Sequence, residues 1–188
     1  MPGPHFKTMH ELAVQQHGVF TTEQAEQMGV SRDRLSKMVR TGDLVRIAYG
    51  LLRDVATPET KLTPYMAAVL WPVGVVGLLS HQTVLALLEI SDVVAGQIHV
   101  TVPKRFRPRS RPLLPGMKLH HAEVPETERT SIEGVPATSI ARAIRDCAAE
   151  HIGPALLGQA LKDARAQGWL TANEADRLEA ELKADTSL

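Results

Sequence analysis

The first fifty or so residues alternate apolar and polar positions in a way that predicts three short helices followed by a β-hairpin. The helices are expected over residues 9–17, 23–28 and 32–41, and the hairpin over residues 44–53. Gly29 separates the second helix from the third, and glycine permits the positive φ that a sharp turn requires. This order of elements is typical of a winged helix-turn-helix.

Polar residues at the expected helix starts agree with these limits. Thr21 followed by Gln24 forms a capping box, and Ser31 is expected to cap the third helix. Ala25 is small where the second and third helices must approach closely. The third helix has an apolar face that would hold it against the other two, made of Val30, Leu35, Met38 and Val39.

The remainder of the chain mixes helical and strand patterns. Helices are expected over residues 63–71, 80–88, 138–150, 154–167 and 172–183, and strands over 97–102, 117–124 and 132–135. Thr63 is expected to cap the first of these helices, and Thr171 with Glu174 forms a second capping box. The predicted fold class is α+β. A winged helix-turn-helix of residues 1–57 precedes a mixed α/β domain of residues 58–188 with a small sheet and several helices.

Positive charge is concentrated locally, although the chain carries 21 Lys and Arg against 21 Asp and Glu. With Leu35 and Met38 facing inward, the 100° step of a helix turns the polar residues between them outward. Such side chains can reach base edges in the major groove, and the wing would lie near the phosphates. The residues expected to bind double-stranded DNA are Ser31, Arg32, Arg34, Ser36, Lys37, Arg40, Arg46 and Tyr49. The alternative is a winged helix that contacts proteins, with these basic side chains merely solvated.

A second basic block has no acidic residue within it, and comprises Lys104, Arg105, Arg107, Arg109, Arg111 and Lys118. The prolines in segment 103–116 exclude a helix, so this segment is expected to project from a hairpin. It would lie along phosphates or dock an RNA or acidic partner. The alternative is a flexible, solubilising loop.

The sequence gives little indication of chemistry. Cys147 is the single cysteine and is expected in a helix core. His120 and His121 should point to opposite faces of a strand, and His81 lacks an obvious third partner, with Ser80 beside it expected to be a helix cap. We therefore expect no catalytic residues, no metal and no cofactor. The lone cysteine and the absence of a secretory signal predict a cytoplasmic protein, and the longest apolar run, residues 66–79, is too short for a membrane span.

Two segments resemble the AbiEi antitoxins of bacterial abortive-infection toxin–antitoxin systems. The first comprises Gly18-Val19-Phe20-Thr21-Thr22, Ala25, Gly29-Val30-Ser31-Arg32, Leu35, Leu44 and the stretch from Arg46 through Gly50 to Leu52. The second is Gly134-Val135-Pro136-Ala137-Thr138-Ser139 leading to Arg142 and Asp146, which is similar to the strand, turn and helix of the family's second domain. Tyr49 stands at the wing tip, where family members often have a basic residue.

The resemblance implies a winged helix that represses its own operon by binding inverted repeats. It also implies a C-terminal domain that carries most of the antitoxin activity. The implied cognate partner is a nucleotidyltransferase-like toxin, with which the antitoxin need not form a stable complex. The alternative function is a protein-interaction module, or a transcriptional regulator unrelated to toxin neutralisation.

Overall fold

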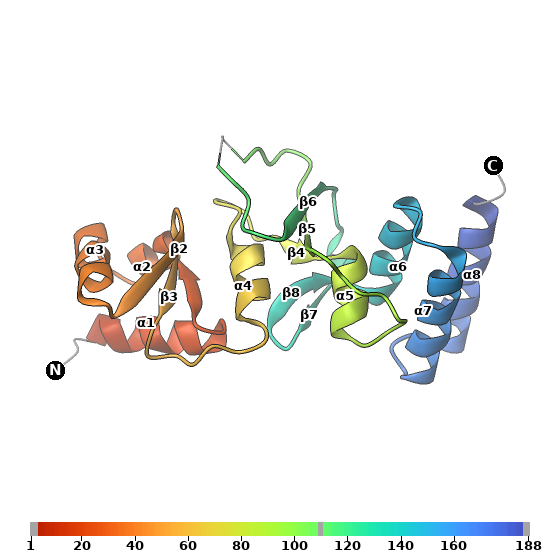
Figure 1. Cartoon of the computed structure of the whole chain (residues 1–188), viewed down its shortest axis with the longest axis horizontal. Coiled ribbons are helices and arrows are strands. Elements are labelled where there is room, and N and C mark those ends of the chain that lie inside the picture. Colours follow the sequence, from red (N-terminus) through yellow and green to blue (C-terminus); the bar gives the residue numbers. More distant parts are fainter. Residues whose placement is uncertain (1–3, 109–110, 186–188) are drawn as a thin grey trace.

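The computed structural model describes residues 4–108 and 111–185, and its α+β architecture confirms the predicted fold class. Three helices and a small sheet form one end of the molecule, a second sheet lies in the middle, and two helices form the other end (Figure 1). None of the helices in the described ranges is long and apolar enough to cross a membrane.

The N-terminal unit is a winged helix. Its helices are α1 (Pro4–Gln15), α2 (Thr22–Gln27) and α3 (Arg32–Thr41), and its strands are β1 (Val19–Thr21), β2 (Leu44–Ala48) and β3 (Leu51–Asp54). The three predicted helices and the hairpin are confirmed, although the first helix begins at Pro4 and not at residue 9, and ends at Gln15. Strand β1 was not predicted, because three residues are too few to show alternation. It pairs antiparallel with β3 and completes a sheet in the order β1-β3-β2.

Helix α4 (Thr63–Leu70) joins this unit to the rest of the chain and is buried along most of its length. It packs against β1 on one side and against the central sheet on the other (Figure 1). The prediction that Thr63 caps it is wrong, because Leu62 occupies the cap position. The Thr63 hydroxyl instead donates to the carbonyl of His17 and accepts from the amide of Thr60. The domain division at residues 57 and 58 stays a prediction.

The central sheet has five strands in the order β6-β5-β4-β8-β7. Their bounds are β4 (Leu78–Leu79), β5 (Ile98–Val102), β6 (Met117–His121), β7 (Arg129–Ile132) and β8 (Val135–Thr138), and a short 3-10 helix, η1 (Glu126–Glu128), precedes β7. Strands β5 and β6 pair in parallel. Segment 103–116 is therefore a crossover between parallel neighbours, and the prediction that it projects from a hairpin is wrong.

The strand predicted over residues 132–135 is in fact a turn between two strands. Glu133 and Gly134 both have positive φ, at 47° and 86°, as the central residues of a type I′ hairpin turn require. Antiparallel pairing of Ile132 with Val135 closes this turn. The sequence located this part of the sheet correctly but predicted a strand where the chain turns, because short apolar stretches flank both sides of the turn.

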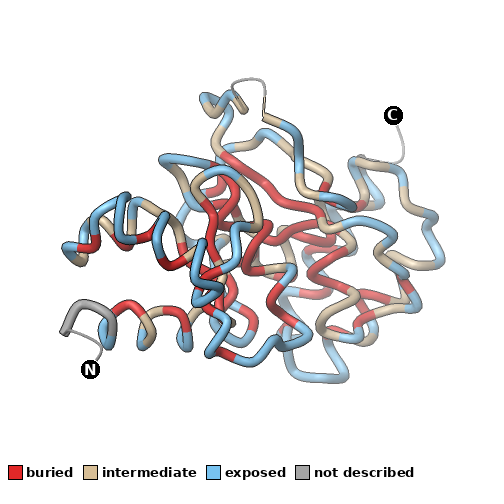
Figure 2. Tube along the Cα trace, turned by 60° about the vertical axis from the view of Figure 1, so that its left-hand side comes forward, coloured by how far each residue is buried: buried red, intermediate tan, exposed pale blue. Residues whose placement is uncertain are grey.

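Four further helices complete the chain: α5 (His81–Leu87), α6 (Ile140–Ala149), α7 (Pro154–Ala166) and α8 (Ala172–Asp185). Helix α6 begins after Ser139, whose hydroxyl accepts from the amide of Arg142, so it does not start at Thr138 as predicted. The capping box of Thr171 and Glu174 is confirmed. Figure 2 shows buried residues along both the winged helix and the rest of the chain. They form two apolar clusters, one inside the winged helix and a larger one around the central sheet, to which Val19 and Leu51 also belong.

Candidate nucleic-acid interface

Local signals set the angle between α2 and α3. The hydroxyl of Thr21 accepts from the amide of Gln24 at 3.1 Å, and the Gln24 side chain accepts from the amide of Thr21 at 2.8 Å. Gly29 has a φ of 81°, which is the left-handed conformation that the turn needs. Ser31 then caps α3 by accepting from the amide of Arg34 at 3.3 Å. These contacts fix α3 as the second helix of the motif.

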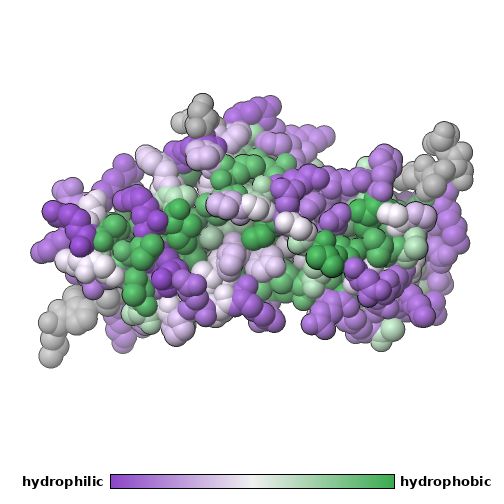
Figure 3. Space-filling model, viewed as in Figure 1, coloured by the Kyte–Doolittle hydropathy of each residue, from purple (hydrophilic) through white to green (hydrophobic). Residues whose placement is uncertain are grey.

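One face of α3 is buried and the other is free. Leu35 and Met38 pack into an apolar cluster with residues of α1, α2 and the wing. Lys37 and Arg40 are exposed on the opposite face, next to the exposed Asp33, and Arg34 is exposed at its edge. The side chains of these three cations make no hydrogen bond or ion pair with any described residue. Figure 3 shows hydrophilic residues gathered over this end of the molecule. Three unpaired cations on one helix face suit a polyanionic partner.

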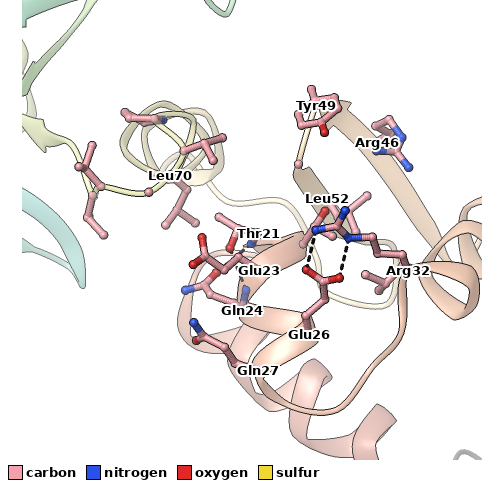
Figure 4. Close-up of a pocket in the computed structure, with 18 of the residues that line it drawn as sticks. Thr21, Glu23, Gln24, Glu26, Gln27, Arg32, Arg46, Tyr49, Leu52 and Leu70 are labelled. Atoms are coloured by element: carbon pink, nitrogen blue, oxygen red, sulfur yellow. Dashed lines mark hydrogen bonds and ion pairs between the residues drawn. The ribbon is translucent and has the colours of Figure 1, made fainter. Parts of the chain in front are cut away.

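Arg32 is arranged differently from the other cations of α3. Its guanidinium donates to both carboxylate oxygens of Glu26, at 2.6 and 3.1 Å (Figure 4). This contact with Arg32 holds the pKa of the half-buried Glu26 carboxyl below its ordinary value. Arg32, which the sequence assigned to DNA binding, is thus partly neutralised within the protein.

The wing presents an aromatic ring and a cation to solvent. Strands β2 and β3 form the wing, and Arg46 and Tyr49 are both exposed. The guanidinium of Arg111, from the distant basic segment, lies 4.2 Å from the ring centroid of Tyr49. The sequence placed Tyr49 and Arg111 in two separate patches, whereas the structure brings them together.

A groove separates the wing from α4. Arg46 and Tyr49 lie on its wing side, and Leu70 lies on the opposite side (Figure 4). Glu23 and Glu26 of α2 add acidic groups to its floor. The groove therefore has mixed charge.

The other residues of the second basic block occupy varied positions. Arg105 is exposed and ion-pairs with no residue of the described chain, whereas Arg107 folds back to donate to the carbonyls of Lys104 and Phe106. The backbone amide of Lys104 donates to Glu123, while its side chain is exposed. Arg109 lies outside the described residues. Lys118 points instead to the carboxylate of Glu150, at 2.8 and 3.0 Å.

The sequence missed a cluster of histidines in the central sheet. His81, His99 and His120 come from α5, β5 and β6, and each offers a nitrogen within 4.8 Å of the others. The expectation that His81 lacks further partners is therefore wrong. Ser80 does not cap α5 through its side chain either, because its hydroxyl lies 2.9 Å from Nδ1 of His81. Burial lowers the pKa of His81 and His120 to about 4, and also lowers the pKa of His99.

Known proteins are similar to this chain in two ways. Residues 8–53 match the family model of the AbiEi antitoxin transcriptional regulators, which confirms the resemblance over the winged helix. The crystal structure of the RV2827C protein from Mycobacterium tuberculosis is similar with a TM-score of 0.52 and 17% identity, and covers 96% of this chain and 72% of that chain. This likeness supports the fold across both sheets. No curated protein matches the chain.

Proposed function

Since residues 8–53 match the family model of AbiEi transcriptional regulators, we propose that this protein binds double-stranded DNA at its own operator and represses its own operon. The observation that carries the proposal is the exposed face of α3. Arg34, Lys37 and Arg40 project from it without intramolecular ion pairs among the described residues. A helix with such a face can enter the major groove, where long side chains contact base edges and phosphates.

The rest of the interface follows from this placement. The wing flanks α3, so Arg46 would face the phosphates next to the groove that α3 occupies. Arg111 lies over Tyr49 and supplies positive charge at a wing tip whose own residue is neutral. Ser31 and the first amides of α3 would hold a further phosphate, because helix N-termini favour anions.

The direct test is a mobility-shift titration of the full chain with its own upstream DNA at several salt concentrations. We expect Lys37→Ala with Arg40→Ala to weaken specific binding sharply, since a base contact is worth roughly 1–3 kcal/mol and each phosphate contact changes the salt slope by about one. Lys162→Ala with Arg165→Ala removes the same charge from α7, and this matched control should leave binding nearly unchanged. Equal loss in both double variants would indicate a nonspecific charge effect.

We further propose that the protein acts as an antitoxin that counteracts a nucleotidyltransferase-like toxin through residues 58–188. The match of residues 8–53 to an antitoxin family supports an antitoxin role. Its assignment to residues 58–188 rests on the resemblance of Gly134–Asp146 to the family's second domain. The test is growth of cells that express the toxin of the neighbouring gene with and without this protein. Rescue by a Lys37→Ala, Arg40→Ala chain that no longer binds DNA would separate toxin neutralisation from repression. Absence of rescue by the full chain would leave a DNA-binding regulator only.

A further inference from the structure

Three histidines from distant parts of the sequence meet in the central sheet. His81 is the first residue of α5, His99 lies in β5 and His120 lies in β6. His81 and His99 are 7% and 4% exposed, and the side chain of His120 is 14% exposed. The parallel pairing of β5 with β6 sets His120 opposite Thr101, two residues beyond His99. Imidazoles gathered in an apolar core need partners for their ring nitrogens.

The spacing of the nitrogens suits a metal ion. Nε2 of His120 lies 3.1 Å from Nδ1 of His99, and His81 offers a nitrogen within 4.8 Å of both. Two nitrogens on a tetrahedral zinc ion, each bonded at about 2.0–2.1 Å, lie about 3.3 Å apart. The rings of His81 and His120 stack with centroids 3.7 Å apart, so binding would require a rotation of the His81 ring out of the stack.

Each of two histidines has an oxygen at its other nitrogen. Nδ1 of His81 lies 2.9 Å from the hydroxyl of Ser80, which also accepts from Thr101 at 2.7 Å. Nδ1 of His120 lies 3.5 Å from a carboxylate oxygen of Glu150. Such oxygens orient metal-binding histidines and fix which nitrogen carries the proton. The nitrogens that remain for the ion are Nε2 of His81, Nε2 of His120 and Nδ1 of His99. Bonds to the ion would replace the 3.1 Å hydrogen bond between the last two.

The backbone at His81 adds an independent observation. Its φ is 53°, a left-handed conformation that residues other than glycine adopt rarely and at a cost of about 1–3 kcal/mol. Such conformations gather at functional sites, where the surrounding structure holds them. Asp146, one helical turn before Glu150, also has a buried carboxylate oxygen without a partner among the described residues. An apolar core requires neither a left-handed backbone at His81 nor an unpaired carboxylate oxygen at Asp146, and both are found at the histidine cluster.

From this geometry we propose that His81, His99 and His120 bind one divalent transition-metal ion of the Zn²⁺ class. Three imidazoles select such ions over Mg²⁺ and Ca²⁺, which prefer oxygen ligands. Glu150, the outer partner of His120, lies at the partly exposed edge where Lys118 ends. The ion would crosslink α5, β5 and β6. The proposal does not depend on DNA binding.

The test is titration of the untagged full chain, stripped with a chelator, with Zn²⁺ and Co²⁺. We expect one equivalent to bind, a higher melting temperature with Zn²⁺, and visible Co²⁺ absorption of a tetrahedral site. His120→Gln should weaken binding by more than 100-fold, and Ser80→Ala by about 10- to 100-fold, as loss of an outer partner does. His121→Gln is the matched control, because His121 is the exposed neighbour of His120 on the same strand, and binding should be unchanged.

Failure of the chain to bind one equivalent of either ion would overturn the proposal, and this measurement needs no variant. Equal weakening by His120→Gln and His121→Gln would place the ion elsewhere and overturn it as well. Circular dichroism checks that each variant folds. If His120→Gln is unfolded, the Co²⁺ spectrum of the folded His99→Asn chain tests the same site. We expect that chain to lose the tetrahedral absorption bands.

Discussion

The guanidinium of Arg111 lies over the ring of Tyr49, 4.2 Å from its centroid, and joins the crossover segment of the central sheet to the tip of the wing. An aromatic ring attracts a cation that lies over its face, and at exposed sites this attraction is worth about 0.5–1 kcal/mol. The contact places a positive charge at the wing tip, in the groove that Arg46 and Arg111 both line. It therefore extends the candidate interface beyond the winged helix itself.

This contact predicts that the wing and the crossover segment act together in DNA binding. Arg111→Ala should reduce the slope of log affinity against log salt by about one, the effect of one lost phosphate contact. Tyr49→Ala should produce a similar loss, because it removes the ring that holds Arg111. The double variant should then be less than additive, as expected for residues in contact. Fully additive losses in the titration would mean that the two side chains act separately.

The ion pair between Arg32 and Glu26 predicts a variant with tighter binding. Glu26→Gln removes a negative charge next to the interface and frees Arg32 from two charged hydrogen bonds. Affinity for DNA should rise, and its salt dependence should become steeper because one more cation can reach a phosphate. Glu179→Gln on α8 removes the same charge far from α3 and serves as the control. Unchanged affinity for Glu26→Gln would show that Arg32 does not face the DNA.

Gly29 provides a test of the turn between α2 and α3. Its φ of 81° is strained for any residue with a Cβ, so Gly29→Ala should lower the free energy of unfolding by about 1 kcal/mol or more. Substitution of Gly158 in α7 by alanine should change the free energy of unfolding in the opposite direction. Nothing lies within 4 Å of a Cβ added there, so Gly158→Ala should stabilise the helix by roughly 0.5–1 kcal/mol. Chemical denaturation measures both, and an unchanged or raised stability of Gly29→Ala would contradict the assignment of the turn.

The sequence predicted the winged helix well because its determinants are local. Thr21 with Gln24, Gly29 and Ser31 each act within three or four residues, and the structure shows them in their expected roles. The residues of α3 that face outward followed from the helical period alone. The partner of Arg32 could not be anticipated, because Glu26 lies on a different helix.

The central sheet was harder to predict because its pairing is non-local. Whether β5 and β6 run parallel or antiparallel depends on the path of the segment between them, and the sequence pattern is the same for both. That pairing also brings His99 and His120 together, so the histidine cluster was missed for the same reason. The positive φ that turns His81 toward them left no signal in the sequence.

Cys147 is predicted to be unreactive in the folded protein. Burial raises the pKa of its thiol to about 12, so the reactive thiolate is nearly absent near pH 8. An aromatic disulfide reagent should label the native chain very slowly and the chain in guanidinium rapidly. The endpoint should be one thiol per chain, since Cys147 is the single cysteine. Rapid labelling of the native protein would show that α6 opens readily or that the thiol is accessible.

The last prediction concerns how the winged helix is joined to the rest of the chain. Val19 and Leu51 of the small sheet belong to the same apolar cluster as α4 and the central sheet. The ring of His17 also contacts the carbonyl of Glu133, in the turn between β7 and β8, at 2.9 Å. Apolar contacts across this boundary are lost if either unit unfolds alone. We therefore expect calorimetry of the full chain to show one cooperative unfolding transition.

Leu51→Ala tests this coupling, because Leu51 is 1% exposed at the boundary. Truncation of a buried leucine costs about 2–5 kcal/mol, and the loss should lower the single transition of the whole chain. Leu113→Ala is the control, since Leu113 is 40% exposed and its truncation should change stability by less than about 0.5 kcal/mol. A variant in which the winged helix melts first, with the remaining transition at its original temperature, would show that the units are independent. It would also support a domain division at residues 57 and 58.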